Sequence, residues 1–98
     1  MKKAIKHYEQ WPIEECLTFI NLYLRDIRKR DVKEVKRTIA SELQRTFSSI
    51  DIRTKEVAKI LSGSDNPYPH LTPNMVEAVE KVLEEGSITK QKMLFLFE

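Results

Sequence analysis

The sequence lacks the features that would indicate a β fold, a secreted protein or a membrane protein. Two glycines and four prolines in 98 residues leave few positions for tight turns, which favours helices. The single cysteine, Cys16, cannot form an internal disulfide, so we predict a cytoplasmic location. No run approaches the roughly 18 consecutive apolar residues of a membrane span, and no apolar run follows Lys2 and Lys3. We therefore predict neither a membrane segment nor a signal peptide.

Residues for catalysis are equally scarce. The two histidines, His7 and His70, are far apart and do not give metal-ligand spacing with Cys16. The only glycines, Gly63 and Gly86, exclude a glycine-rich phosphate loop. Adjacent glutamate pairs do not face each other on a helix. We predict that the protein is not an enzyme and needs no metal or cofactor.

The charge is distributed unevenly along the chain. Residues 1–64 hold 14 Lys and Arg against 9 Asp and Glu, a net charge of +5. Residues 65–98 hold 3 against 6, a net charge of −3. The basic excess peaks at residues 25–31. Such polarity suits a protein that lays one face on a polyanion.

Apolar periodicity, caps and glycine stops predict an all-α bundle of four or five helices. The first helix is expected to begin at Trp11-Pro12, and the second to run from Asp31 to near Phe47. The third is capped by Ser48 and stops at Ser62-Gly63, and the fourth runs from Thr72-Pro73 to Gly86. A last element, capped by Ser87, runs from Ile88 to Phe97. Residues 64–71 read as a loop, and the last element fits a helix or an extended segment. We predict one domain over residues 1–98, with a helix-turn-helix core at about 11–63 and a helical extension at 72–98.

The apolar stripes of these helices predict the core. The inward residues expected are Ile13, Leu17, Ile20, Leu24 and Ile27 on the first helix, Val32, Val35, Ile39 and Leu43 on the second, and Ile50, Val57, Ile60 and Leu61 on the third. The first helix also carries Phe19, Leu22 and Tyr23 on its other side, so it is apolar almost all round. It is therefore either the central helix or part of an interface, for example in a homodimer.

The outer side of the third helix suggests a function. It combines small polar, basic and apolar side chains, at Ser48, Asp51, Ile52, Lys55 and Lys59. A recognition helix that enters the major groove needs such a face, because side chains there meet base edges and phosphates.

The same region resembles the last two helices of a Myb/SANT-type or homeodomain-like helix-turn-helix. The resemblance is carried by Ile39-Ala40, Leu43, Arg45-Thr46, Ser49-Ile50, Arg53 and Leu61, preceded by Trp11, Glu14-Glu15 and Leu17. The chain is most similar, over about residues 11–83, to the N-terminal module of prokaryotic HNH-type restriction endonucleases. It resembles that module in Tyr23 and in an Arg-x-x-Ser-Ile motif, here Arg45, Ser48 or Ser49, and Ile50. Their nuclease domain has no counterpart here, and Asp51 and Glu56 would repel phosphates unless Asp51 accepts from a cytosine amino group.

We therefore expect a double-stranded DNA-binding protein, a regulator or a targeting module. The expected DNA contacts are Arg45, Ser48, Ser49, Ile52, Lys55, Lys59, Lys36, Arg37, Arg28 and Arg30. The serines would donate to phosphate, Ile52 would touch a thymine methyl, and the cations would neutralise the backbone. Arg53 lies nearer the core, so we expect it to pair with Glu14 or Glu15.

Two alternatives use the same frame. The first is a protein-interaction module, for example a viral or mobile-element inhibitor, that uses the second apolar side of the first helix and the Leu94–Phe97 tail. For Ile52 the alternative to a thymine contact is that it rests on the tail or on a protein partner. The second is a fragment of a larger nuclease.

Overall fold

The computed structural model describes residues 11–63 and 73–97, and every regular element within these ranges is a helix. The helices are α1 (Ile13–Asp26), α2 (Val32–Leu43), α3 (Phe47–Ser62), α4 (Pro73–Glu85) and α5 (Lys90–Phe97). The predicted all-α bundle is confirmed. The expected loop at 64–71 and both histidines lie outside the described residues.

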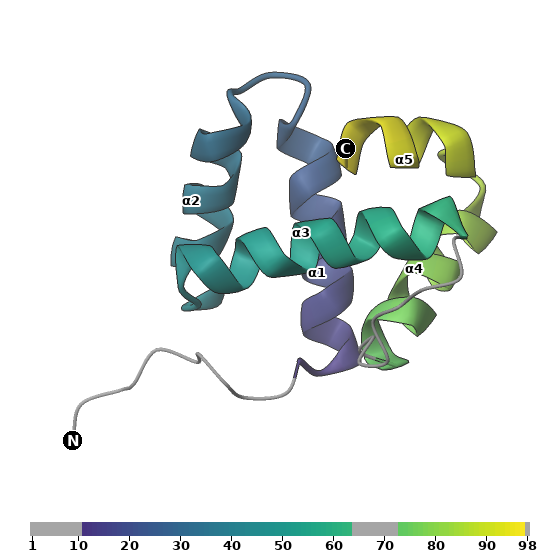
Figure 1. The fold of residues 1–98 in the computed structure, drawn as a ribbon, viewed down its shortest axis with the longest axis horizontal. Coiled ribbons are helices and arrows are strands. Elements are labelled where there is room, and N and C mark those ends of the chain that lie inside the picture. Colours follow the sequence, from purple (N-terminus) through teal and green to yellow (C-terminus); the bar gives the residue numbers. More distant parts are fainter. Residues whose placement is uncertain (1–10, 64–72, 98) are drawn as a thin grey trace.

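The helices pack around α1 and α3. Figure 1 shows α1 and α2 side by side, with α3 crossing them. α4 contacts both α1 and α3, and α5 packs along α3 with its C-terminal end close to the end of α1. Because α1 lies between α2 and α4, it takes the central position that its apolar surface predicts.

The buried side of α1 differs from the predicted one. Its fully buried apolar residues are Cys16, Phe19, Ile20 and Tyr23. Of the predicted stripe only Ile20 is fully buried, while Ile13, Leu17, Leu24 and Ile27 are partly buried and pack against the core. A helix that is apolar all round has no single stripe to read, and here the large aromatic side chains are the ones that face the core.

The stripes of α2 and α3 are closer to prediction. Val35 and Ile39 are fully buried and Leu43 is partly buried, but Val32 is exposed. On α3, Ile50, Val57 and Leu61 are buried, and Ile60 is partly buried. Both helices therefore turn the expected sides toward the core.

The helix ends correct two predicted caps. Asp31 caps α2 as predicted, because its carboxylate accepts the Lys33 backbone N–H at 3.1 Å. The cap of α3 is Thr46, whose hydroxyl accepts the Ser49 N–H at 3.1 Å; Ser48 lies in the first turn. Similarly, Thr89 accepts the backbone N–H of Lys92 before α5, where the sequence suggested Ser87.

The α3 cap gives a direct test. Replacing Thr46 with alanine should lower the free energy of unfolding by about 1 kcal/mol, because a backbone N–H of the first turn loses its acceptor. Ser48→Ala is the matched control, since Ser48 is exposed and does not cap the helix. Urea unfolding of both variants should show a lower free energy of unfolding for Thr46→Ala alone. A larger decrease for Ser48→Ala would mean that Ser48 is the cap, as the sequence predicted.

The C-terminal element is a helix and closes the core. Met93 and Phe97 are buried, and the Phe97 ring stacks on Tyr23 with a centroid separation of 4.1 Å. The Tyr23 hydroxyl donates to the Leu96 carbonyl at 2.9 Å. Of the two conformations that the sequence allows for this segment, the structure therefore has the helical one, joined to α1.

Candidate nucleic-acid interface

α2 and α3 are joined by a tight turn of residues 44–46. Gln44 adopts the left-handed conformation with φ of 56°, and its N–H donates to the carbonyls of Ala40 and Ser41. The Arg45 N–H donates to the Ala40 carbonyl at 2.9 Å. This is a left-handed helix closure, which satisfies the last carbonyls of α2 and ends the helix before the predicted position near Phe47.

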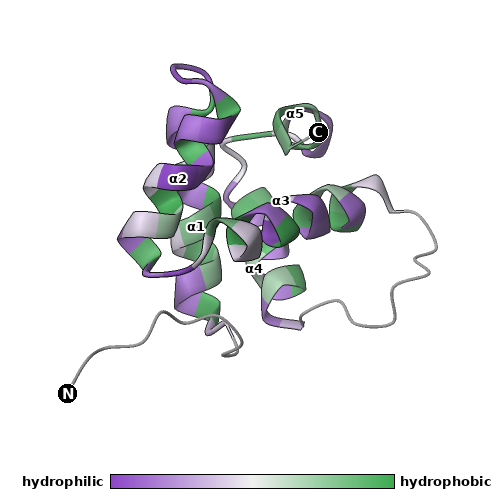
Figure 2. Cartoon of the chain, turned by 60° about the vertical axis from the view of Figure 1, so that its left-hand side comes forward, coloured by the Kyte–Doolittle hydropathy of each residue, from purple (hydrophilic) through white to green (hydrophobic). Residues whose placement is uncertain are grey.

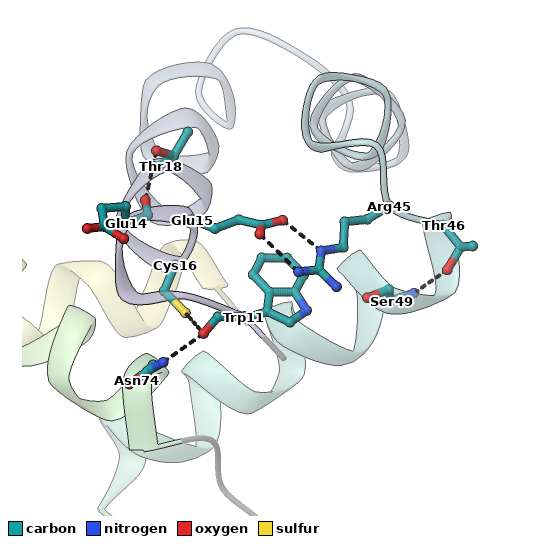
Figure 3. A network of polar contacts seen from close by, with 9 residues as sticks. All are labelled: Trp11, Glu14, Glu15, Cys16, Thr18, Arg45, Thr46, Ser49 and Asn74. Atoms are coloured by element: carbon teal, nitrogen blue, oxygen red, sulfur yellow. Dashed lines mark hydrogen bonds and ion pairs between the residues drawn. The ribbon is translucent and has the colours of Figure 1, made fainter. Parts of the chain in front are cut away.

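The side chain of the turn residue Arg45 is buried against α1. Its Nε and Nη2 atoms donate to the two carboxylate oxygens of Glu15 at 2.7 and 2.9 Å. Its guanidinium carbon lies 4.3 Å from the centre of the Trp11 ring. Figure 3 shows Glu15 reaching from α1 toward Arg45, with the indole beside the guanidinium. We call Trp11, Glu15 and Arg45 the buried clamp; it ties the turn to the start of α1.

The clamp extends toward α4. The Trp11 carbonyl accepts a hydrogen bond from the Asn74 side-chain amide at 2.9 Å and a weaker one from the Cys16 thiol at 3.9 Å (Figure 3). The Trp11 ring also meets Phe19 edge to face, with centroids 5.7 Å apart. Burial raises the pKa of Cys16 to about 11, so its thiol stays protonated and acts as a packing group.

A second arginine lies near the same tryptophan. Arg53, expected to pair with Glu14 or Glu15, donates from Nη1 to Glu56 of its own helix at 2.5 Å. Its guanidinium carbon is 5.7 Å from the Trp11 ring centre. Glu56 is buried, so this carboxylate faces the interior and not a phosphate. Glu56 therefore lies off the outer side of α3, and its charge is paired with that of Arg53.

The α3 outer face, as predicted, comprises Ser48, Asp51, Ile52, Lys55 and Lys59. Ser48 is exposed, Ile52 is 56% exposed, and the Lys55 side chain is 74% exposed. Asp51 and Lys59 are half-buried. The structure therefore keeps a serine, an apolar residue and a lysine in solvent on this face.

Asp51 connects this face to α2. Its Oδ1 atom lies 2.6 Å from the Lys36 ammonium, and its Oδ2 atom lies 3.2 Å from the Lys55 ammonium. The hydrogen bond from Lys36, with the charges of both lysines, lowers the pKa of Asp51 below its usual value. The carboxylate is thus ionised at neutral pH and neutralises part of the positive charge.

Further cations lie on α2 and on the connection that precedes it. Lys33 and Arg37 are exposed, and they share a face with Lys36 because residues three and four apart are neighbours on a helix. Residues 28–30 are also exposed, and Figure 2 shows this connection as a hydrophilic loop. The α2 cations are therefore the ones that flank the α3 outer face.

Arg30 points to the other side of α2. Its Nη1 atom donates to the Thr38 hydroxyl at 3.3 Å. Thr38 and Lys36 are two residues apart, which places them about 200° apart around the helix. Arg30 therefore contacts a side of α2 other than the one that carries Lys36, and its contact with the flanking DNA backbone stays a prediction. Arg28 is exposed in the same connection.

Two expected DNA contacts lie inside the protein. Arg45 is only 3% exposed and its guanidinium is held in the buried clamp. Ser49 is buried as well, and its N–H serves the Thr46 cap. Neither side chain can reach a phosphate in this structure, so both assignments are corrected to structural roles.

One helix cap and two ion pairs that shape the region were not predicted from the sequence. Threonine is a favoured residue at an N-cap, but Thr46 has Ser49 three residues later, whereas Ser48 has the acidic Asp51, so the sequence pattern favoured Ser48. The pairing of Glu15 with Arg45 spans 30 residues, and that of Lys36 with Asp51 spans 15. No local spacing signals such contacts, which arise only when the helices pack.

Other kinds of site are not evident in the described part of the chain. Residues 11–63 and 73–97 contain no group of three or more His, Cys, Asp or Glu side chains that could hold a metal ion. No helix in these ranges combines the length and apolarity needed to cross a bilayer. Comparison with protein-family models, curated proteins and solved structures found no match to this chain.

Proposed function

We propose that this protein binds double-stranded DNA, with the α3 outer face in the major groove, and acts as a regulator or a targeting module. The observation that carries the proposal is the exposure of Ser48, Ile52 and Lys55 on one side of α3 while its other side is packed in the core. Two helices joined by a turn of three or four residues, the second of them in the groove, are a common way to read DNA.

The chemistry of the face suits this role. Ser48 lies in the first turn of α3, where the positive end of the helix dipole favours a phosphate. Lys55 supplies a flexible cation, and Ile52 offers an apolar surface that fits a thymine methyl. Lys33 and Arg37 of α2 would neutralise the flanking backbone. The buried clamp would hold α3 at a fixed angle, so the groove would meet a preformed surface.

A salt titration of duplex binding tests the proposal. We expect the logarithm of affinity to fall linearly with the logarithm of salt concentration, with a slope of about −3 from three or four phosphate contacts. Lys55→Gln should reduce the slope by about one. Fluorescence anisotropy of a labelled duplex between about 50 and 200 mM salt measures both quantities.

The matched control for Lys55 is Lys81→Gln. Lys81 is exposed on α4, so the substitution changes the net charge equally but leaves the α2–α3 surface intact. An equal change in slope for both variants, or no salt-dependent binding by the wild type, would contradict the proposal.

A protein-interaction module is the second proposal, and it now rests on fewer exposed apolar residues than the sequence suggested. The second apolar side of α1, on which it drew, is packed inside, since Phe19 and Tyr23 are buried. In the C-terminal tail, which forms α5, Phe97 is buried and Phe95 is 76% exposed. A single exposed ring is common on protein surfaces, so this observation weighs less than the α3 outer face. Capture of a partner that Phe95→Ala abolishes, without salt-dependent DNA binding, would favour this alternative.

A further inference from the structure

The α3 outer face contains its own anion. Asp51 projects from α3 between two lysines of different helices, Lys36 of α2 and Lys55 of α3. Each of its two carboxylate oxygens contacts one ammonium group, at 2.6 and 3.2 Å respectively. The face that meets a polyanion under the proposed function is therefore partly neutralised before any ligand arrives.

The two lysines are held to different degrees. The Lys36 side chain is only 15% exposed, and its contact with Asp51 is the shorter one. Lys55 is mostly in solvent, where an ion pair contributes little and is easily exchanged for another partner. A phosphate can thus take Lys55 away from Asp51, whereas Lys36 is retained.

The same geometry decides what Asp51 can do itself. Before DNA is bound, each oxygen of Asp51 contacts an ammonium. If a phosphate takes Lys55 while Lys36 stays on Oδ1, only Oδ2 loses its partner, so a hydrogen bond from a cytosine amino group, the one role in which an acid on a recognition helix would favour DNA, would have to use that oxygen. Its negative charge still repels phosphate, so its net effect on a polyanion is unfavourable.

We propose that Asp51 limits the affinity of the α3 outer face for DNA phosphates by sequestering Lys36 and competing for Lys55. This inference rests on the proposed function. Asp51 thereby lowers sequence-independent binding, and a larger share of the affinity is left to base contacts of neighbours such as Ile52. A lysine can switch between these partners because its ammonium sits on a flexible four-carbon stem.

The experiment compares wild type, Asp51→Asn, Lys36→Gln and the double variant in duplex binding across a salt series. Asp51→Asn should steepen the salt slope by about one and tighten binding about eightfold near 0.1 M salt, since Lys36 becomes available for one more phosphate. Lys36→Gln alone should leave the slope unchanged. The double variant should return the slope to the wild-type value.

Two controls separate this effect from simpler ones. Glu80→Gln, on the exposed side of α4, gives the same change in net charge and should leave binding unchanged. Asp51→Glu keeps the charge and should behave as the wild type. Asparagine has the shape of aspartate and Asp51 is half-buried, so circular dichroism should show the Asp51→Asn variant folded.

The outcomes distinguish the inference from the function on which it rests. Wild-type binding with no gain from Asp51→Asn, or an equal gain from Glu80→Gln, overturns the role of Asp51 and leaves DNA binding in place. Binding by the Asp51→Asn variant alone supports the role of Asp51 and contradicts a DNA function for the natural chain. Absence of binding by both overturns both proposals.

Discussion

Replacing Arg45 with methionine is expected to lower the free energy of unfolding by about 3–5 kcal/mol. The reason is that Glu15, whose side chain is almost as buried as that of Arg45, would keep its charge but lose both hydrogen bonds and the positive charge that Arg45 supplies. The variant would also lose the guanidinium packed on Trp11. A DNA-contact residue on the surface would show no such loss, so the experiment separates the two roles of Arg45.

Urea unfolding followed by far-UV circular dichroism measures this effect. Arg37→Met is the matched control, because Arg37 is exposed on α2 and a surface substitution should change stability by no more than about 0.5 kcal/mol. The double variant Arg45→Met with Glu15→Leu should recover most of the loss, since a buried ion pair replaced by apolar residues is often tolerated. A small loss of stability together with weakened DNA binding would place Arg45 back in the interface.

The sequence predicted the helices better than their contacts. The glycine at position 63 and the proline at position 73 mark true helix ends, because their backbone preferences are local. The end of α2 was missed because Gln44 adopts a positive φ that non-glycine residues seldom show. That early closure moves the cap of α3 from Ser48 to Thr46. Local rules therefore fail where a left-handed residue ends a helix without glycine.

The sequence predicted which side chains of the candidate site are exposed, but it did not predict the buried contacts that hold the site in place. The 3.6-residue period correctly placed Ile52 and Lys55 outward, because exposure follows from the angle around a helix. Arg45 lies outside the helices, so no periodicity indicated that it turns inward. The pairing of Lys36 with Asp51 depends on how α2 and α3 cross, and no local pattern in the sequence reveals that crossing.

The second large effect is expected at the C-terminus. Replacing Phe97 with alanine should cost about 3–4 kcal/mol of unfolding free energy. The Phe97 ring is buried, stacks on Tyr23 and approaches Phe19 with a centroid separation of 6.2 Å, so its removal leaves a cavity beside these two remaining rings. Phe95→Ala is the same chemical change two residues earlier, on a side chain that is mostly in solvent, and should be nearly neutral.

This pair of variants also bears on function. α5 packs along α3, so loosening Phe97 removes support from the helix that carries the proposed DNA contacts. DNA affinity of Phe97→Ala should fall only in proportion to the unfolded fraction, because no residue of the α3 outer face is changed. Equal stability loss for both variants would mean that the tail does not pack as described. If Phe95→Ala instead keeps normal stability but loses capture of a protein partner, the exposed ring is a contact with that partner. The buried Phe97 would then stabilise the fold, and the exposed Phe95 would bind the partner.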